Sequence, residues 1–161
     1  MSPLQIDFQA LNRESWSETE RHNVALVSDF VQHLMNNHDF DYVMDNFDNS
    51  VYVQHNVAIP NGITGLVDFV ATFAKRFPEY GYDVKQIMAD DDLVMFHSHC
   101  TLKAKHRGND NQGMVIIDYW RIVDGQIAEH WDSIQTITFW QTLLFNFYKL
   151  SGRKNSNGVF G

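Results

Sequence analysis

Between Ser17 and Asn36, apolar residues recur every three or four positions, which is the period of a helix buried along one side. Ser17 and Glu20 have the spacing of a capping box, in which a hydroxyl and a carboxylate bind free backbone N–H groups at a helix start. The sequence therefore predicts a helix from Ser17 to about Met35, with a single apolar stripe: Val24, Val27, Phe30, Val31, Leu34 and Met35.

Two further helices and a short strand are expected before residue 80. Asp39 can cap a short helix that contains Phe40, Tyr42, Val43 and Phe47. Residues 51–55 are β-branched and aromatic enough to form a short strand. After a turn at residues 59–62, Thr64 opens a helix whose apolar residues continue to Phe77, and Pro78 ends it.

Four long segments after Gly81 are predicted to be consecutive strands. Tight breaks separate them at residues 90–92, at residues 108–113 and at Asp124-Gly125, the last being a strong hairpin signal. Helices followed by an antiparallel meander favour an α+β fold in which the helices pack on the concave face of a bent sheet. The four segments are Tyr82–Ala89, Leu93–Lys105, Met114–Val123 and Gln126–Gln135.

Composition and charge narrow the possible functions of the 161 residues. The length suits one domain, and the chain has no apolar run long enough to span a bilayer. The N-terminus does not resemble a secretion signal, so the cytoplasm is the expected compartment. The formal net charge of −8, with scattered basic residues, argues against nucleic acid as a partner. Cys100 is the only cysteine and is interpreted as a small buried apolar residue.

The domain core is expected to span about residues 18–136, within a single domain that covers residues 1–161. Beyond it, the segment Phe139–Leu150 is too apolar for a free tail. We expect it to form a helix that docks on the body of the domain or on a second subunit, followed by a loose end.

Histidines and aspartates lie unusually often within the predicted strands. Because strand side chains alternate between faces, His97 and His99 share a face, as do His130 and Asp132 in the last strand. Asp118 is flanked by apolar residues, so it is expected to be buried with a raised pKa. Two registers are open: a strict hairpin at residues 124 and 125 pairs Asp118 with Trp131, whereas a bulge places it with His130 and Asp132.

Several motifs resemble the SnoaL-like polyketide cyclase family, and in particular its bacterial branch of aldol-condensation proteins. The resemblance runs from about Glu20 to Gln135 and implies the cone-shaped α+β barrel of nuclear transport factor 2, in which a curved, mixed sheet wraps around N-terminal helices. It also implies the bulged register. The motifs are Val53-Gln54-His55-Asn56, His97-Ser98-His99, Ile117-Asp118-Tyr119-Trp120-Arg121 and residues 124–132.

The resemblance also implies residue roles. Asp118 falls where polyketide cyclases keep an acid/base aspartate, and Asp132 where limonene epoxide hydrolases of this fold place a water-activating aspartate. His97 and His99 occupy the positions of the hydrolase arginine and second aspartate, and His55 that of its pocket asparagine. The missing arginine counts against epoxide hydrolysis.

The hypothesis that follows is cofactor-independent proton transfer next to a carbonyl, as in aldol cyclisation or isomerisation, in a buried pocket without a metal. In this hypothesis Asp118 moves the proton, and His97 and His99 stabilise the enolate. His130 and Asp132 orient these two imidazole rings or a water molecule. The expected partners are a small hydrophobic carbonyl compound and a second copy of the chain. The residues expected to contact the substrate are His55, Asn56, Tyr42, Phe73, Trp120 and Trp131.

Three alternatives stay open. The domain is a non-catalytic ligand-binding dimer of the same fold, a hydrolase that activates water on an epoxide or lactone, or a metal site built from histidine and aspartate. For each strand histidine taken alone, the simpler interpretation is a buried core residue whose ring nitrogens are hydrogen-bonded and which has no role in a site.

Overall fold

The computed structural model describes residues 2–138, 140, 143 and 144. Its N-terminal part is helical. Ser17 and Glu20 form the predicted capping box at the start of α2, with the Ser17 N–H donating to Glu20 Oε2 over 2.7 Å. The helical elements are α1 (Phe8–Leu11), α2 (Glu18–Val31), the π-helix η1 (Gln32–Asn37), α3 (Phe40–Phe47), α4 (Gly62–Arg76) and the 3₁₀ turn η2 (Ala104–His106).

Five strands form one sheet in the order β1-β5-β4-β3-β2. The short strand β1 lies parallel to β5, and every other neighbouring pair is antiparallel. Asp124 and Gly125 both have positive φ, as expected for the tight turn between β4 and β5. The bounds are β1 (Val53–Gln54), β2 (Gly81–Asp90), β3 (Leu93–Thr101), β4 (Met114–Val123) and β5 (Gln126–Thr136).

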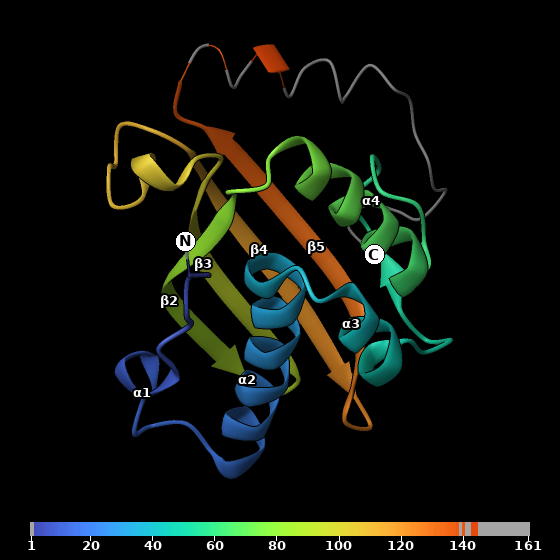
Figure 1. Cartoon of the computed structure of the whole chain (residues 1–161). Helices are drawn as coiled ribbons and strands as arrows, with labels where there is room; N and C mark the ends of the chain where they lie inside the picture. Colours follow the sequence, from blue (N-terminus) through green and yellow to red (C-terminus); the bar gives the residue numbers. More distant parts are fainter. Residues whose placement is uncertain (1, 139, 141–142, 145–161) are drawn as a thin grey trace.

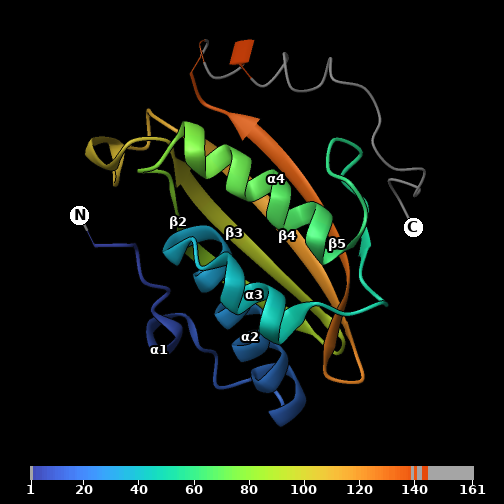
Figure 2. The same ribbon diagram turned by 45° about the vertical axis from the view of Figure 1, so that its right-hand side comes forward.

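Helices α2, α3 and α4 cover one face of the curved sheet (Figure 1, Figure 2). The apolar core lies between these helices and the sheet, with Val27 and Phe30 of α2 and Phe96 and Trp120 of the sheet among its members. The opposite, outer face is more exposed, because Met88 and Tyr119 keep 45% and 42% of their surface accessible. The predicted α+β fold, with helices on one face of a bent sheet, is confirmed. None of the described helices is long and apolar enough to cross a membrane.

Some boundaries differ from the prediction. The second long strand ends at Thr101 instead of Lys105, because the chain then turns into η2, and the short strand comprises only Val53 and Gln54. The apolar stripe that runs to Met35 ends in the π-helix η1, and α4 starts at Gly62, two residues before Thr64. The helix α1 was not predicted. Most of the predicted helix at Phe139–Leu150 lies outside the described residues.

Candidate functional site

A bulge between β4 and β5 brings Asp118, His130 and Asp132 onto the inner face of the sheet. Arg121 is paired with Glu129, whereas the next residue, Ile122, is paired with Ile127, so one extra residue is inserted in β5. Beyond this point Asp118 lies directly opposite Asp132, and Trp120 lies opposite His130. The structure thus selects the bulged register of the two that the sequence leaves open.

Asp118 and His130 form a buried pair. Each exposes 5% of its surface, and His130 Nε2 lies 3.2 Å from Asp118 Oδ1. Burial raises the pKa of Asp118 because it disfavours the charged carboxylate, while the hydrogen bond and charge of His130 act in the opposite direction. The nearby negative charge of Asp132 adds to the increase in pKa. The pair can therefore take up or release a proton away from bulk water.

Side chains from the segment around β1 hold this pair in place. His130 Nδ1 lies 3.2 Å from Gln54 Oε1, and Gln54 Nε2 donates to the Tyr52 hydroxyl over 3.0 Å. Asn56 Nδ2 donates to both carboxylate oxygens of Asp132, each at 2.8 Å. The predicted contact residue Asn56 is therefore part of the cluster, where it binds Asp132, and its contact with a substrate stays a prediction.

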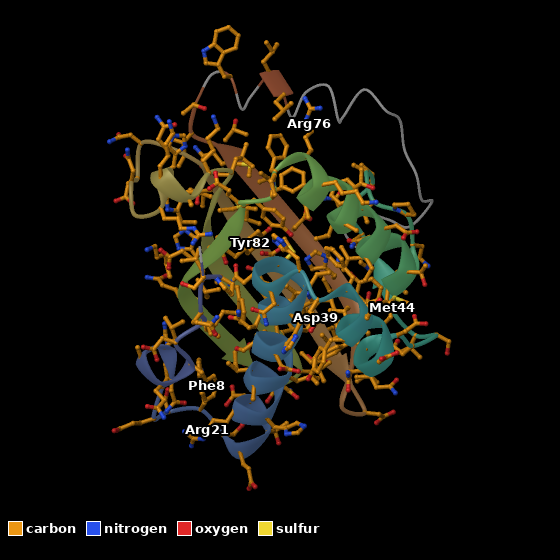
Figure 3. All side chains as sticks on the ribbon, in the orientation of Figure 1. Phe8, Arg21, Asp39, Met44, Arg76 and Tyr82 are labelled. Carbon is orange, nitrogen blue, oxygen red and sulfur yellow. The ribbon has the colours of Figure 1, made fainter. Side chains whose placement is uncertain are left out.

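Two buried tyrosines, Tyr52 and Tyr82, have pKa values that the charges of the cluster raise. Burial raises the pKa of Tyr52 well above its usual value, and the charges of Asp132 and Asp118 raise it further. Burial also raises the pKa of Tyr82 well above its usual value, and the charge of Asp118 is the second largest cause of this increase. Tyr82 lies in the interior, between the sheet and the helices (Figure 3). Both phenols stay protonated at neutral pH and are O–H donors.

Three buried polar atoms of the inner face have no hydrogen-bond partner among the described residues. They are Asp118 Oδ2, Ser98 Oγ and Trp120 Nε1. Strand pairing places all three side chains on one face, since Asp118 is paired with Phe96 and Trp120 with Val94. An unmet buried donor or acceptor is costly, so these atoms are positions at which water or a bound molecule can make hydrogen bonds.

The prediction that His97 and His99 share the site of Asp118 is wrong. Strand pairing places Phe96, and not His97, opposite Asp118, so both histidines lie on the other face of β3. His99 is buried there with its Nε2 atom 2.6 Å from the Gln112 carbonyl oxygen. The sequence showed that the two rings share a face but not which residue of the next strand lies opposite each.

The expectation that His55 and Trp131 belong to the same site is also wrong. Their rings stack at 4.4 Å, and His55 Nε2 lies 3.0 Å from Glu129 Oε2. Trp131 and Glu129 lie on the outer face of β5, because His130 and Asp132 occupy the inner face. Arg121 completes this outer group by donating to Glu129 Oε1 over 2.9 Å.

The remaining three predicted contact residues are Trp120, Tyr42 and Phe73. Trp120 stacks on His130 with ring centres 5.2 Å apart, so it is a wall of the cluster. Tyr42 donates to Asp29 Oδ2 over 2.9 Å, and Phe73 packs edge-on against Tyr80. These contacts place Tyr42 and Phe73 among the helices and loops, and their role as walls of a substrate site stays a prediction.

Sequence reasoning missed Gln54, Tyr52 and Tyr82 as members of the cluster. A sequence signal existed for Gln54, because this polar residue directly follows Val51, Tyr52 and Val53 in the predicted strand and belongs to one of the family motifs. In the structure Gln54 is fully buried. No comparable signal marked the tyrosines, since apolar aromatic residues are common in strands.

Asp118, His130 and Asp132 also form a set that could hold a metal ion. One ligand atom of each lies within 4.8 Å of the others. This set differs from the predicted one, because the pair of histidines His97 and His99 lies on the other face of the sheet.

Comparison with known proteins assigns the fold and the family. Among proteins with curated descriptions, none matches the chain. A provisionally assigned polyketide cyclase from Bacillus cereus is 21% identical, with a TM-score of 0.63 over 81% of this chain and 87% of that chain. A second provisional polyketide cyclase, from Acidithiobacillus ferrooxidans, is 14% identical, with a TM-score of 0.60 over 83% and 99% of the two chains.

AclR, a provisionally assigned hydroxylase from Streptomyces galilaeus, is 21% identical, with a TM-score of 0.57 over 77% of this chain and 85% of that chain. The structural similarity, at identities below 25%, shows a shared fold. The family follows from the sequence itself, because the profile of the SnoaL-like domain matches residues 27–130, which include Asp118 and His130. The chain belongs to the SnoaL-like domain family.

Proposed function

We propose that this protein catalyses cofactor-independent proton transfer at a carbon atom next to a carbonyl group, with Asp118 as the acid/base. The reaction is an aldol-type cyclisation or an isomerisation of a small hydrophobic carbonyl compound. The observation that carries the proposal is the buried pair of Asp118 and His130, in which the second carboxylate oxygen of Asp118 has no partner among the described residues.

Each step of the proposed reaction has a group on the inner face that can perform it. The Asp118 carboxylate takes a proton from the carbon, and the electron pair of the broken C–H bond moves to the carbonyl, forming an enolate. Trp120 Nε1 and the Tyr82 hydroxyl are neutral donors that can bind the enolate oxygen. In a cyclisation, the enolate carbon attacks a second carbonyl, whose oxygen takes up the electron pair and then the proton held by Asp118. In an isomerisation, Asp118 returns the proton to another carbon of the conjugated enolate.

Burial makes Asp118 a better base than an ordinary aspartate. A carboxylate with a raised pKa holds a proton more strongly, which lessens the mismatch with a weakly acidic C–H group. His130 keeps the ionised form accessible, since its hydrogen bond and charge favour the carboxylate. The two effects together support a proton that moves reversibly between Asp118 and the substrate.

The proposal can be tested without knowing the natural substrate. Wild-type protein is incubated in D₂O with a panel of ketones, aldehydes and β-keto compounds, and deuterium entry next to the carbonyl is followed by NMR. We expect exchange above the buffer rate for at least one compound and a loss of roughly 10²–10⁴-fold in Asp118→Asn.

Asp124→Asn is a matched control for that substitution. Asp124 lies in the exposed hairpin turn at a φ of 49°, which asparagine also tolerates. The control should keep wild-type exchange. Binding of a panel compound without exchange in any variant would instead support the alternative of a non-catalytic ligand-binding protein.

A cation site at Asp118, His130 and Asp132 is a second candidate, because their ligand atoms lie within 4.8 Å of one another. Elemental analysis of the purified protein and dialysis against a chelator separate the two candidates. Under the proton-transfer proposal, deuterium exchange survives the chelator.

A further inference from the structure

We infer that Gln54 is a positioning residue that fixes the protonated ring nitrogen of His130 as Nδ1, which leaves Nε2 to share a proton with Asp118. The inferred proton position is a property of the resting protein. Its consequence for catalysis rests on the proposed function.

The orientation of the Gln54 amide is set by a backbone group. The Asn56 N–H lies 2.9 Å from one terminal atom of Gln54, and a backbone N–H can only donate. That terminal atom must therefore be the carbonyl oxygen Oε1. The amide nitrogen Nε2 then faces the Tyr52 hydroxyl at 3.0 Å, to which it donates.

The same oxygen faces His130, which decides where the ring carries its proton. His130 Nδ1 lies 3.2 Å from Gln54 Oε1, and two acceptors would repel each other at this distance. Nδ1 must therefore donate. A neutral imidazole has one N–H, so its Nε2 atom carries a lone pair.

That lone pair makes Asp118 and His130 a proton-sharing pair. His130 Nε2 lies 3.2 Å from Asp118 Oδ1, and a hydrogen bond between them needs one proton on either atom. The pair is thus either a neutral acid donating to a neutral ring or a carboxylate accepting from an imidazolium. With the proton on Nε2 of a neutral ring instead, His130 would serve only as a fixed donor to Asp118.

Packing prevents Gln54 and His130 from rearranging. Gln54 is completely buried, its backbone N–H donates to Asn61 Oδ1 over 2.8 Å, and β1 pairs Gln54 directly with His130. On the other side, the Trp120 ring stacks on the imidazole. Turning the amide over would set two donors, Nε2 and the Asn56 N–H, against each other.

The ring nitrogens of His130 report the inference directly. In ¹⁵N-labelled wild-type protein without substrate, long-range ¹H–¹⁵N spectra distinguish a protonated ring nitrogen from a bare one. The His130 signals are assigned by their disappearance in His130→Gln. We expect Nδ1 to carry a proton at every pH at which the protein is folded, because it faces the acceptor Gln54 Oε1. A bare Nδ1 in the wild type at any pH at which the protein is folded would overturn the inference.

Variants of Gln54 test the cause. Gln54→Met removes the acceptor, so at high pH the neutral ring should move its proton from Nδ1 to Nε2. Gln54→Glu keeps an acceptor at this position and should keep Nδ1 protonated. As a control, Gln86→Met, at an exposed residue of β2, should leave the spectrum unchanged. An unchanged His130 tautomer in folded Gln54→Met would refute the role of Gln54.

Activity separates this inference from the proposed function. If the inference and the proposed function both hold, Gln54→Met lowers the deuterium-exchange rate by roughly 10–100-fold, because His130 loses its fixed orientation, and Gln54→Glu restores part of the rate. If no compound exchanges in the wild type but Nδ1 is protonated, the proposed function fails and the inference stands. If exchange depends on Asp118 but Nδ1 is bare, the inference alone fails.

Discussion

Asp118 and Asp132 lie directly opposite each other on neighbouring strands, so two carboxylates share the inner face of the sheet. Directly paired residues of antiparallel strands have their Cβ atoms about 5 Å apart. The negative charge of Asp132 adds to the effect of burial in raising the pKa of Asp118, while the Asn56 amide binds both oxygens of Asp132. Of the two carboxyl groups, Asp118 is therefore the one whose raised pKa favours holding a proton.

Neutralising Asp132 should make Asp118 more acidic. In Asp132→Asn the repulsion between the carboxylates is lost, so the pKa of Asp118 falls toward its usual value. Since the base must be ionised, the acidic limb of the pH profile for deuterium exchange should move to lower pH. The profile of Asp124→Asn serves as the control and should stay in place. A limb that moves to higher pH in Asp132→Asn would contradict the assignment of Asp118 as the base.

The raised pKa of Asp118 also has a consequence for stability. The folded protein binds the Asp118 proton more tightly than the unfolded chain, whose aspartates have an ordinary pKa of 3.8. This contribution to stability is complete below pH 3.8 and is lost as the pH rises through the folded value. Urea unfolding at a series of pH values should therefore show wild type losing stability relative to Asp118→Asn across this interval. A difference that is independent of pH would argue against a raised pKa.

Gly113 should be far less tolerant of substitution than Gly108. Both residues have positive φ, but a Cβ at Gly113 would lie 2.4 Å from the Cys100 carbonyl oxygen and 2.8 Å from His99 Nε2, whereas Gly108 has open space. We expect Gly108→Ala to cost about 1 kcal/mol. Gly113→Ala should cost roughly 1–3 kcal/mol more, because the overlap forces the backbone apart. Chemical denaturation of the two variants measures the difference in their free energies of unfolding. Equal decreases in the two variants would show that small shifts of the backbone relieve the overlap with β3 at little cost in free energy.

Self-association is expected to use the outer face of the sheet. Strand pairing aligns four large side chains across this face: Met88, Met95, Tyr119 and Trp131. Tyr119 is 42% exposed at the centre of this row. If the predicted homodimer forms there, Tyr119→Lys should shift the protein to a monomer in sedimentation experiments. A control, Lys75→Glu, changes an exposed charge on α4, which covers the opposite face of the sheet, and should leave the association unchanged.

The sequence predicted the order of the elements because their signals are local. The capping box at Ser17, the stop at Pro78 and the turn at Asp124-Gly125 each depend on a few adjacent residues. The site was harder to predict, because a shift of one residue in register moves a side chain to the other face of a sheet. The bulge in β5 joins Asp118 to His130, and the pairing of β3 with β4 separates His97 and His99 from both.

Alternation within a strand shows which residues share a face but not which face of the neighbouring strand they meet. Family resemblance supplied the missing register for Asp118 and implied wrong positions for His97, His99 and His55. Gln54 was missed for a different reason: its importance lies in the atoms it faces, His130 Nδ1 and the Asn56 N–H, and these contacts exist only after β1 has paired with β5.

The ionisation of Asp118 in the resting protein tests the central claim most directly. In protein labelled with ¹³C at the aspartate carboxyl groups, the Asp118 signal is assigned by its loss in Asp118→Asn and followed through a pH titration. The proposed acid/base role predicts a pKa above 3.8 and a matching inflection in the ring signals of His130, because the two groups share one proton. A pKa at or below 3.8, with no response in His130, would contradict it.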